Sequence, residues 1–372
     1  MIQRKKASRI SHNRSRLAVG LLALSSASVV MAACGSSSSS STSTTSSGSG
    51  STATTTATAS AAAYFKGKTI TLISPYPPGG DYDLYPRIFA PELSKILHAT
   101  VNVEDVSGGG GLVGVNQMAH SAPNGLTLGL VNTTGAISDV IAHAPGVNFN
   151  VTSLSWIGQP GTVPYALITK PNSSITSFNG ILHVSKPVTV LDDKTGGDDP
   201  IERVVFGAFN IPHTLLTGFA GAAAIKQAFL NNEGQLLFQP ITAYKSFISS
   251  GQAKVLLLSS TPQTSYIKKL GSGAPTVKEA LSKAHLSSAA VAAVEEELLL
   301  SKLEFDFAGP PGIPSTRLAV LRQAFLQAAQ ASATKILAQK DGEVISPISG
   351  ATLASEISSA VKEAQSITPY VS

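Results

Sequence analysis

A short strand-like run, a glycine-rich turn and a helical stretch follow one another repeatedly along this chain. The order occurs at residues 69–97, again at 100–120 and once more at 187–209. Strands that alternate with helices favour layered α/β structure over an all-β fold or a helical bundle. With 372 residues, of which 43% are apolar, the chain has enough material for two lobes of this kind.

Composition and periodicity assign the individual elements. We expect strands at residues 69–74, 100–105, 127–132, 155–159, 165–169, 187–192, 235–238 and 254–259. We expect helices at 84–97, 112–120, 201–209, 222–231, 316–330 and 350–366, and a mainly helical segment at 271–302.

The N-terminus has the layout of a secretory signal peptide, predicted at residues 1–33. Six cations precede residue 17, an apolar run follows at 17–31, and small residues stand before Cys34. That run is shorter than the roughly 20 residues a transmembrane helix needs. Cys34 is the only cysteine, and its surroundings resemble the lipobox of bacterial lipoproteins. We therefore expect an acylated Cys34 to anchor an exported protein to the outer face of the cell membrane.

Residues 34–63 are predicted to be a disordered tether. After Cys34 they consist of Gly, Ser, Thr and Ala, without a charge or a large apolar side chain. Such a segment buries too little surface to offset its chain entropy. As a flexible coil it would have an r.m.s. span of about 30 Å, which holds a domain clear of a lipid surface.

The formal net charge of +5 comes from the N-terminal cations. The 27 basic side chains fall to 21 when those six are set aside, against 22 acidic side chains. The remaining chain therefore lacks the excess of positive charge that a nucleic-acid backbone requires, and we predict no nucleic-acid partner.

The first glycine turn contains Gly79, Gly80 and Asp81, followed by Asp83, and stands between a strand and a helix. Glycine lets the backbone turn sharply and approach a ligand, while Asp81 or Asp83 can cap the helix. The free N–H groups and the dipole at such a helix start favour an anionic ligand. A capped turn without a ligand is the alternative.

The second glycine turn covers residues 107–111, again before a helix. Its glycines with Gly114 satisfy G-x-G-x-x-G, but no acidic residue follows about 20 positions on, as a dinucleotide site requires. We therefore prefer a backbone cradle for an anion or carboxylate. The candidate binding residues in this turn are Ser107, Gly109, Gly110 and Gly111.

Two further loops follow predicted strands. Asn132, Thr133 and Thr134 offer hydroxyl and amide groups, and ligands in open α/β sheets bind at the C-terminal ends of strands. The loop with Thr195 and Gly196 also carries four carboxylates, and clustered Asp residues suit a hard cation. Because their spacing fits no EF-hand loop, we prefer a capped, partly solvated loop and predict no metal and no cofactor. Those four carboxylates are Asp192, Asp193, Asp198 and Asp199.

Motifs for catalysis are missing from the sequence. No G-x-S-x-G, H-E-x-x-H or C-x-x-C motif occurs, and the seven histidines are scattered. We therefore predict that the protein is not an enzyme.

Six segments, in order, resemble the extracytoplasmic solute-binding receptors of tripartite tricarboxylate transporters, the Bug proteins. Residues 70–83 are similar to the family's opening strand and G-G-x-x-D loop, and residues 101–114 to its second strand and glycine loop. Residues 122–128, A-P-N-G-L-T-L, are similar to its A-P-D-G-Y-T-L segment. Residues 217–221, 274–279 and 307–314 resemble its Y-K-G-G, P-T-x-x-E and A-P-A-G-T-P segments.

The resemblance implies a two-lobed, periplasmic-binding-protein-like α/β fold, each lobe a mostly parallel sheet flanked by helices. Residues 64–165 and 301–372 are expected to form one lobe, and 166–300 the other. The family binds its solute in the cleft between lobes, largely through backbone N–H groups. On this chain those groups belong to Gly79, Gly80, Asp81, Gly109, Gly110 and Gly111. We expect the other end of the solute to meet Asn132, Thr133, Thr134, Thr195 and the Phe219 loop.

The predicted function is capture of a small organic carboxylate, or a related polar metabolite, for the membrane subunits of a tripartite transporter. The Asp-rich loop departs from the family's Ser and Gly pattern and would repel a di- or tricarboxylate. A monocarboxylate with a polar or cationic group, or a neutral compound, would suit it better, and Lys170, Arg203 and Lys226 would offset the charge if they face the cleft. Two alternatives stay open: an exported metal-dependent enzyme using the Asp-rich loop, and a solute sensor for a signalling partner.

Overall fold

The computed structural model describes residues 59–192, 200–219 and 221–371, which lie in the compact unit Ser49–Ser372. Residues 59–65 form a helix, and Ala61 and Phe65 are buried, so the predicted tether extends too far at its C-terminal end. The predicted signal peptide, Cys34 and the rest of the tether lie outside the described residues, as do Asp193, Thr195, Gly196, Asp198 and Asp199.

Among the described residues, six strands form the first sheet, in the order β11-β4-β10-β3-β1-β2. They are β1 (Thr69–Ser74), β2 (Thr100–Asp105), β3 (Thr127–Val131), β4 (Ser155–Gln159), β10 (Asp306–Gly309) and β11 (Ile348–Ser349). β1 pairs in parallel with β2 and β3, whereas β10 and β11 pair antiparallel with their neighbours. The sheet is mixed rather than mostly parallel, because the chain re-enters it through β10 in the opposite direction.

The second sheet has the order β7-β6-β8-β5-β9. Its strands are β5 (Tyr165–Thr169), β6 (Val188–Leu191), β7 (His213–Leu216), β8 (Leu236–Pro240) and β9 (Lys254–Leu258). β6 pairs in parallel with β7 and β8, and β5 pairs antiparallel with β8 and β9, so this sheet too is mixed. The sequence did not predict β7, β10 or β11, which are short and take their extended form from pairing with neighbours.

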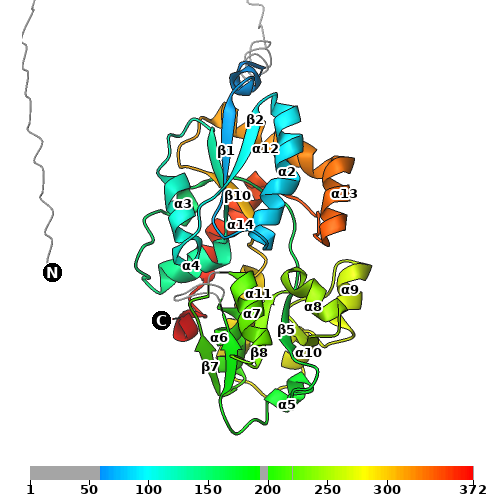
Figure 1. Ribbon diagram of the computed structural model, residues 1–372. Coiled ribbons are helices and arrows are strands. Elements are labelled where there is room, and N and C mark those ends of the chain that lie inside the picture. The colour runs from blue at the N-terminus through cyan, green and yellow to red at the C-terminus, as the bar shows by residue number, and fades with distance from the viewer. Residues whose placement is uncertain (1–58, 193–199, 220, 372) are drawn as a thin grey trace, which may run out of the picture. The chain divides into compact units, whose positions relative to one another are not determined.

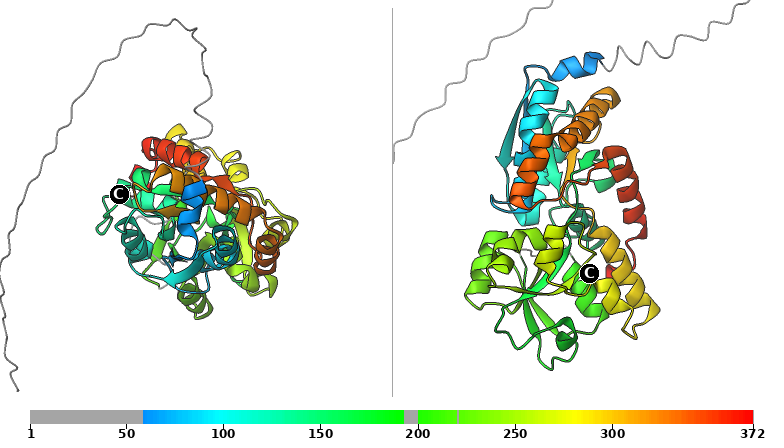
Figure 2. Two further views of the ribbon diagram at one scale, coloured as in Figure 1. Left: turned by 90° about the horizontal axis from the view of Figure 1, so that it is seen from above. Right: turned by 90° about the vertical axis from the view of Figure 1, so that its right-hand side faces the viewer.

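Helices cover both sheets. Around the first sheet lie α2 (Asp81–Leu97), η1 (Gly109–Gly111), α3 (Leu112–Ala119), α4 (Thr133–Ile141), η2 (Val151–Ser153), α12 (Ser315–Gln330), α13 (Ser332–Asp341) and α14 (Gly350–Glu363). Around the second lie α5 (Phe178–Ile181), α6 (Ile201–Ala208), α7 (Ala222–Leu230), η3 (Ile241–Tyr244), α8 (Lys245–Ser249), α9 (Ser265–Gly271), α10 (Val277–Leu281) and α11 (Ser288–Leu300). Figure 1 shows α3 and α2 on opposite sides of β1, and Figure 2 shows α12 and α13 beside α2, which they contact.

The core follows from the alternation of side chains along the strands. In β5, Tyr165 and Leu167 join one buried apolar cluster, and Ala166 and Ile168 join another. Both faces of the strand are therefore covered, which explains why β5 reads as a continuous apolar run. The predicted two-lobed α/β fold class is confirmed, with each sheet between layers of helices.

The chain crosses between the sheets after β4, at residues 160–164, and returns after α11, at residues 301–305. At the C-terminus, α15 (Thr368–Val371) contacts α4 beside the first sheet and α6 beside the second. These connections place the loops that follow β1 and β8 on opposite walls of one pocket.

Candidate functional site

One pocket takes its walls from segments that belong to both sheets. Its volume is about 60 Å³, which is room for a few water molecules. It is lined by Tyr76, Pro77, Pro78, Gly80, Asp81, Tyr82, Gly221, Ala222, Ala223, Gln239, Pro240, Ala243 and Phe305. Of the predicted binding residues, Gly80 and Asp81 line this pocket directly.

The first wall is the turn between β1 and α2. Gly79 has φ of 100°, a left-handed conformation that favours glycine, and its N–H donates to Asp83 Oδ2 at 3.1 Å. Arg87 Nε donates to the other oxygen of Asp83 at 2.5 Å, and its Nη2 donates to Asp105 at 2.8 Å. The carboxylate of Asp83 therefore closes the turn before α2. It does not cap the helix as predicted, because no side chain accepts a cap hydrogen bond at the start of α2.

Asp81 is the first residue of α2 and is only 5% exposed. Thr242 in η3 donates a hydrogen bond to Asp81 Oδ2 at 2.5 Å, which ties the first lobe to the second. Burial raises the pKa of Asp81, while the Thr242 hydrogen bond and the positive charges of Lys245 and Lys226 oppose that rise.

The second glycine turn lies behind Tyr76 rather than in the pocket lining. The Tyr76 hydroxyl donates to the Gly110 carbonyl at 2.8 Å. A Cβ on Gly111 would lie 3.1 Å from the Tyr76 ring, so glycine permits this close packing. Gly109 and Gly110 also have positive φ, and Ser107 and Gly109 are exposed. Tyr76, which the sequence did not single out, therefore connects this turn to the pocket.

The third predicted turn is a helix start with buried side chains. Asn132 caps α4, where its Oδ1 accepts from the Gly135 N–H at 3.0 Å. Thr133 donates to Asp306 Oδ2 at 2.6 Å, and Thr134 donates to the carbonyls of Leu300 and Leu303. The structure therefore corrects the expected loop to a helix. Thr133 connects α4 to the start of β10, and Thr134 connects it to the end of α11 and the returning crossing segment.

The second wall comes from α7 and the end of β8. Gly221, Ala222 and Ala223 form the start of α7, two residues beyond Phe219, which packs against the apolar cluster and is absent from the described lining. Gln239 in β8 donates to Asp192 Oδ1 at 3.1 Å, so Asp192 lies under the pocket wall and is only 1% exposed. Gln239 follows the predicted strand 235–238, and the rule that ligands meet strand C-termini would have identified it.

Three aromatic side chains line the remaining part of the pocket. The rings of Tyr76 and Tyr82 lie 4.6 Å apart between centroids, and those of Tyr82 and Phe305 lie 4.7 Å apart. Phe305 has φ of 58°, an uncommon conformation for a bulky residue, in the segment that returns from the second sheet. Strained backbone of this kind persists where the surroundings fix it, and here buried aromatic packing does so.

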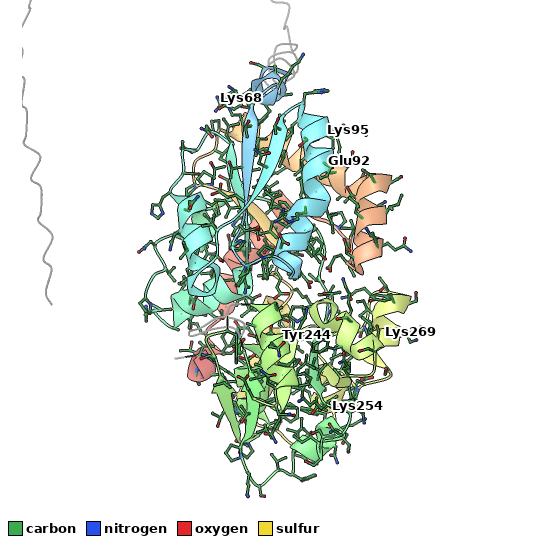
Figure 3. All side chains as sticks on the ribbon, in the orientation of Figure 1. Lys68, Glu92, Lys95, Tyr244, Lys254 and Lys269 are labelled. Atoms are coloured by element: carbon green, nitrogen blue, oxygen red, sulfur yellow. The ribbon has the colours of Figure 1, made fainter. Side chains whose placement is uncertain are left out.

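Charged groups surround the pocket behind its walls. Lys226 Nζ lies 5.5 Å from the centre of the Tyr244 ring. Figure 3 labels Tyr244, near the upper end of the second lobe. Lys245 Nζ lies 3.8 Å from Glu343 Oε1. Burial raises the pKa of Glu343 well above its usual value, and the charge of Asp81 adds to the effect. Burial also lowers the pKa of Lys226, against the attraction of Asp81.

Lys170 is one of the three cations expected to offset the acidic loop, and it lies away from the pocket. Its Nζ donates to the carbonyl of Leu230 at 3.3 Å, at the end of α7 opposite to the pocket. Lys226 is the member of the set whose charge acts on Asp81. Within the described residues, no group of three or more His, Cys, Asp or Glu side chains is arranged to hold a metal ion.

Comparison with known proteins finds a match to one family model. Residues 86–192 match the sequence model of a family described as the tripartite tricarboxylate transporter family receptor. This match, over less than a third of the chain, bears out the resemblance described from the sequence motifs. The matched segment contains the second glycine turn and ends at Asp192, beside the pocket wall.

Curated relatives match about a third of the chain. Protein BugT from Bordetella pertussis is 31% identical over 119 residues, which are 32% of this chain and 36% of that protein. A second protein from the same organism, of the UPF0065 group, is 28% identical over 123 residues, or 33% of this chain and 38% of the relative. The chain thus spans little more than a third of the length of these relatives.

Solved structures extend the likeness to the entire fold. MatC from Rhodopseudomonas palustris with bound malate has a TM-score of 0.65 at 17% identity, over 81% of this chain and 99% of that one. An R. palustris protein with adipate has a TM-score of 0.64 at 16% identity, over 80% and 97%. These likenesses confirm the periplasmic-binding-protein-like fold.

In the part of the chain that the structure describes, no helix combines the length and the apolar composition needed to cross a membrane.

Proposed function

We propose that this protein is an exported receptor that captures a small organic carboxylate, or a related polar metabolite, for a transporter of the tripartite tricarboxylate type. The observation that carries the proposal is the pocket itself, whose lining comes from the β1–α2 turn of one lobe and from α7 and β8 of the other. A solute held there touches both lobes and favours their closure around it.

The electrostatics of the pocket suit one anionic group. The starts of α2 and α7 both face it, and the first N–H groups of a helix have no partner within the helix. Together with the helix dipoles, these groups favour a carboxylate. The family match supports the same class, as do the folds of the structures that hold malate and adipate.

The proposal also includes export and anchoring. A signal peptide at residues 1–33, an acylated Cys34 and a tether up to the helix at 59–65 would hold the receptor near the membrane subunits that receive its solute. Metabolic labelling with radioactive palmitate tests the anchor: we expect label in the wild-type protein and none in a Cys34→Ala variant. Label retained in that variant would contradict the proposed lipid anchor at Cys34.

Isothermal titration calorimetry with small carboxylates, amino acids and neutral metabolites tests the proposed function. We expect one solute to bind with a stoichiometry near one and to be recovered chemically unchanged. Turnover of the solute, or a calorimetric response to calcium alone, would favour the metal-dependent enzyme instead.

A further inference from the structure

Gln239 carries the single side-chain amide among the described residues of the pocket lining. It lies near the C-terminal end of β8 and is only 8% exposed. Its Nε2 donates to Asp192 Oδ1 at 3.1 Å. A carboxylate oxygen accepts hydrogen bonds and donates none, so this bond turns the amino group of the amide toward Asp192. The carbonyl end of the amide therefore points away from Asp192.

The oxygen at that carbonyl end, Oε1 of Gln239, is an acceptor that faces the pocket. It has no hydrogen-bond partner among the described residues, and it is not one of the unpartnered atoms that are sealed inside the protein. Since most of the side chain is buried, the open space that Oε1 meets is the pocket that Gln239 lines. An unpaired polar atom in a nearly buried position costs free energy, which a donor on the solute recovers.

The remaining polar groups of the pocket are arranged to hold a carboxylate. Asp81, the carboxyl group of the lining, already receives a hydrogen bond from Thr242 in the opposite lobe. At the starts of α2 and α7, the first N–H groups have no partner within their helices. The pocket thus offers backbone donors for a carboxylate together with the open acceptor of Gln239. A solute that satisfies both needs a hydrogen-bond donor in addition to its carboxylate.

The charges near the pocket favour a neutral donor over a cationic one. Lys226 on α7 and Lys245 on α8 both attract the carboxylate of Asp81. Burial raises the pKa values of Glu304 and Glu343 well above their usual values, which favours the neutral forms of these two acids. Asp81 therefore lies beside two ammonium groups, and a further ammonium group on the solute would be repelled by them. A hydroxyl supplies the donor without that repulsion.

We infer that Gln239 makes the receptor selective for small hydroxycarboxylates, whose hydroxyl donates to Gln239 Oε1 while their carboxylate binds the helix starts. The inference rests on the proposed function and specifies its substrate class. Asp192 is a positioning residue, because its hydrogen bond to Nε2 sets which end of the amide faces the solute. The pocket volume of about 60 Å³ suits a solute of few heavy atoms.

Matched solutes test this selectivity on the purified full chain by titration calorimetry. The three-carbon set is propanoate, lactate, pyruvate and alanine; the four-carbon set is butanoate, 3-hydroxybutanoate, acetoacetate and 3-aminobutanoate, with both enantiomers of each chiral solute. Within a set, one carbon carries no polar group, a hydroxyl, an oxo group or an ammonium group. In at least one set we expect a hydroxy acid to bind about tenfold or more tightly than the other members, because these leave the acceptor unpaired or add a positive charge.

The variant Gln239→Met removes the amide but keeps the length of an unbranched side chain. We expect it to lose about tenfold or more in affinity for the hydroxy acid and to bind the oxo acid nearly as the wild type does. Gln252→Met is the matched control, because it removes an exposed amide outside the described lining, whose Oε1 accepts from Ser250 Oγ at 3.0 Å. It should leave the order of the solutes unchanged.

The variant Asp192→Asn separates positioning from a structural role. Asparagine has nearly the same shape, but it can donate to Gln239 as well as accept from it, so the amide of Gln239 can turn its amino group toward the pocket. The oxo acid then finds a donor that the wild type does not offer. We expect the ratio of the affinities for the hydroxy and oxo acids to fall toward one. A merely structural role would weaken the binding of both acids alike and keep the ratio.

Two results would overturn the inference and leave the receptor function in place: no preference for the hydroxy acid in either set, or an equal loss for every solute in Gln239→Met. Tighter binding of the amino acid would likewise overturn it, since the donor would then be an ammonium group. If none of these solutes binds while another carboxylate does, the inference fails alone. If no carboxylate binds, the proposed function fails with it.

Discussion

Gly80 lies in the pocket lining with φ of −108° and ψ of 175°, an extended conformation that any residue adopts. A Cβ built on it meets no atom within 4 Å. Gly110 differs, because its φ of 65° is left-handed. One glycine therefore leaves room in the pocket, and the other serves the backbone geometry of the second turn.

These two glycines give opposite predictions for substitution by threonine. Gly80→Thr should leave the thermal midpoint unchanged, since threonine is a good N-cap, but weaken solute binding about tenfold or more, or about 1.4 kcal/mol. Gly110→Thr should lower the free energy of unfolding by about 1–3 kcal/mol, the usual cost of such strain. Thermal melts with and without solute measure both effects. Full affinity in Gly80→Thr would show that the solute does not approach this backbone.

Asp83 supports the fold of the first turn, although the sequence placed it among the ligand-binding candidates. Asp83→Ala loses the hydrogen bonds from the Gly79 N–H and from Arg87, so we expect the free energy of unfolding to fall by about 1–2 kcal/mol. Chemical denaturation measures the loss. The control is Lys95→Ala, which removes an exposed pair 3.5 Å from Glu92 and should change stability by less than about 0.5 kcal/mol.

At the scale of elements, the segment that returns from α11 to β10 concentrates buried acid. Burial raises the pKa values of Glu304 and Asp306 well above their usual values, and the charge of Asp81 adds to the shift at Glu304. Thr133 at 2.6 Å and Gln159 at 2.9 Å donate to Asp306, so hydrogen bonds from α4 and β4 offset part of the free-energy cost of burying this carboxyl group. The crossing is thus held by polar links rather than by apolar packing alone.

The raised pKa of Glu304 predicts a stability that depends on pH. An acid with a higher pKa in the folded state stabilises the fold fully below its unfolded value, near 4.5, and loses that contribution as the pH rises through the folded pKa. Glu304→Gln should therefore match the wild type in acid and exceed it by about 1 kcal/mol or more at higher pH, as for removal of a buried unpaired charge. Denaturation curves across the pH range measure the difference, and a constant difference at every pH would contradict the assignment.

At the scale of the molecule, two lobes contribute to one pocket, and the chain crosses between them after β4 and again before β10. The C-terminal helix α15 adds contacts to helices beside both sheets. A solute in the pocket therefore couples the stability of one lobe to that of the other.

Ligand-linked stabilisation should need both walls of the pocket. A solute at 100 times its dissociation constant stabilises the fold by about 2.7 kcal/mol. We expect Ala222→Val on α7 to reduce this shift as Gly80→Thr does, because both residues line the pocket. Leu182→Ala, an exposed change away from the described lining, should keep the full shift in thermal melts. An undiminished solute-induced thermal shift in Ala222→Val would indicate that the solute contacts only the first lobe.

Local sequence predicted most elements because their signals are local. The β-rich run at 69–74, the amphipathic stretch at 201–208 and the glycine turns each bias the backbone without help from distant residues. β10 and the helix start at Thr133 escaped prediction. β10 is four residues long and includes Asp306, a charged residue type that is buried there with hydrogen bonds from Thr133 in α4 and Gln159 in β4.

By itself, the sequence determined the layered α/β class, the resemblance to the receptor family, and the turns at Gly79–Asp81 and 107–111, since composition, periodicity and motif order can be read from the chain alone. Only the tertiary structure decided that Asp81 meets Thr242, that Tyr76 connects the second turn to the pocket, and that Gln239 and α7 form the opposite wall. Those contacts join residues far apart in sequence. They arise from the pairing of β10 with β3 and β4 and from the crossings between the sheets, which no local pattern encodes.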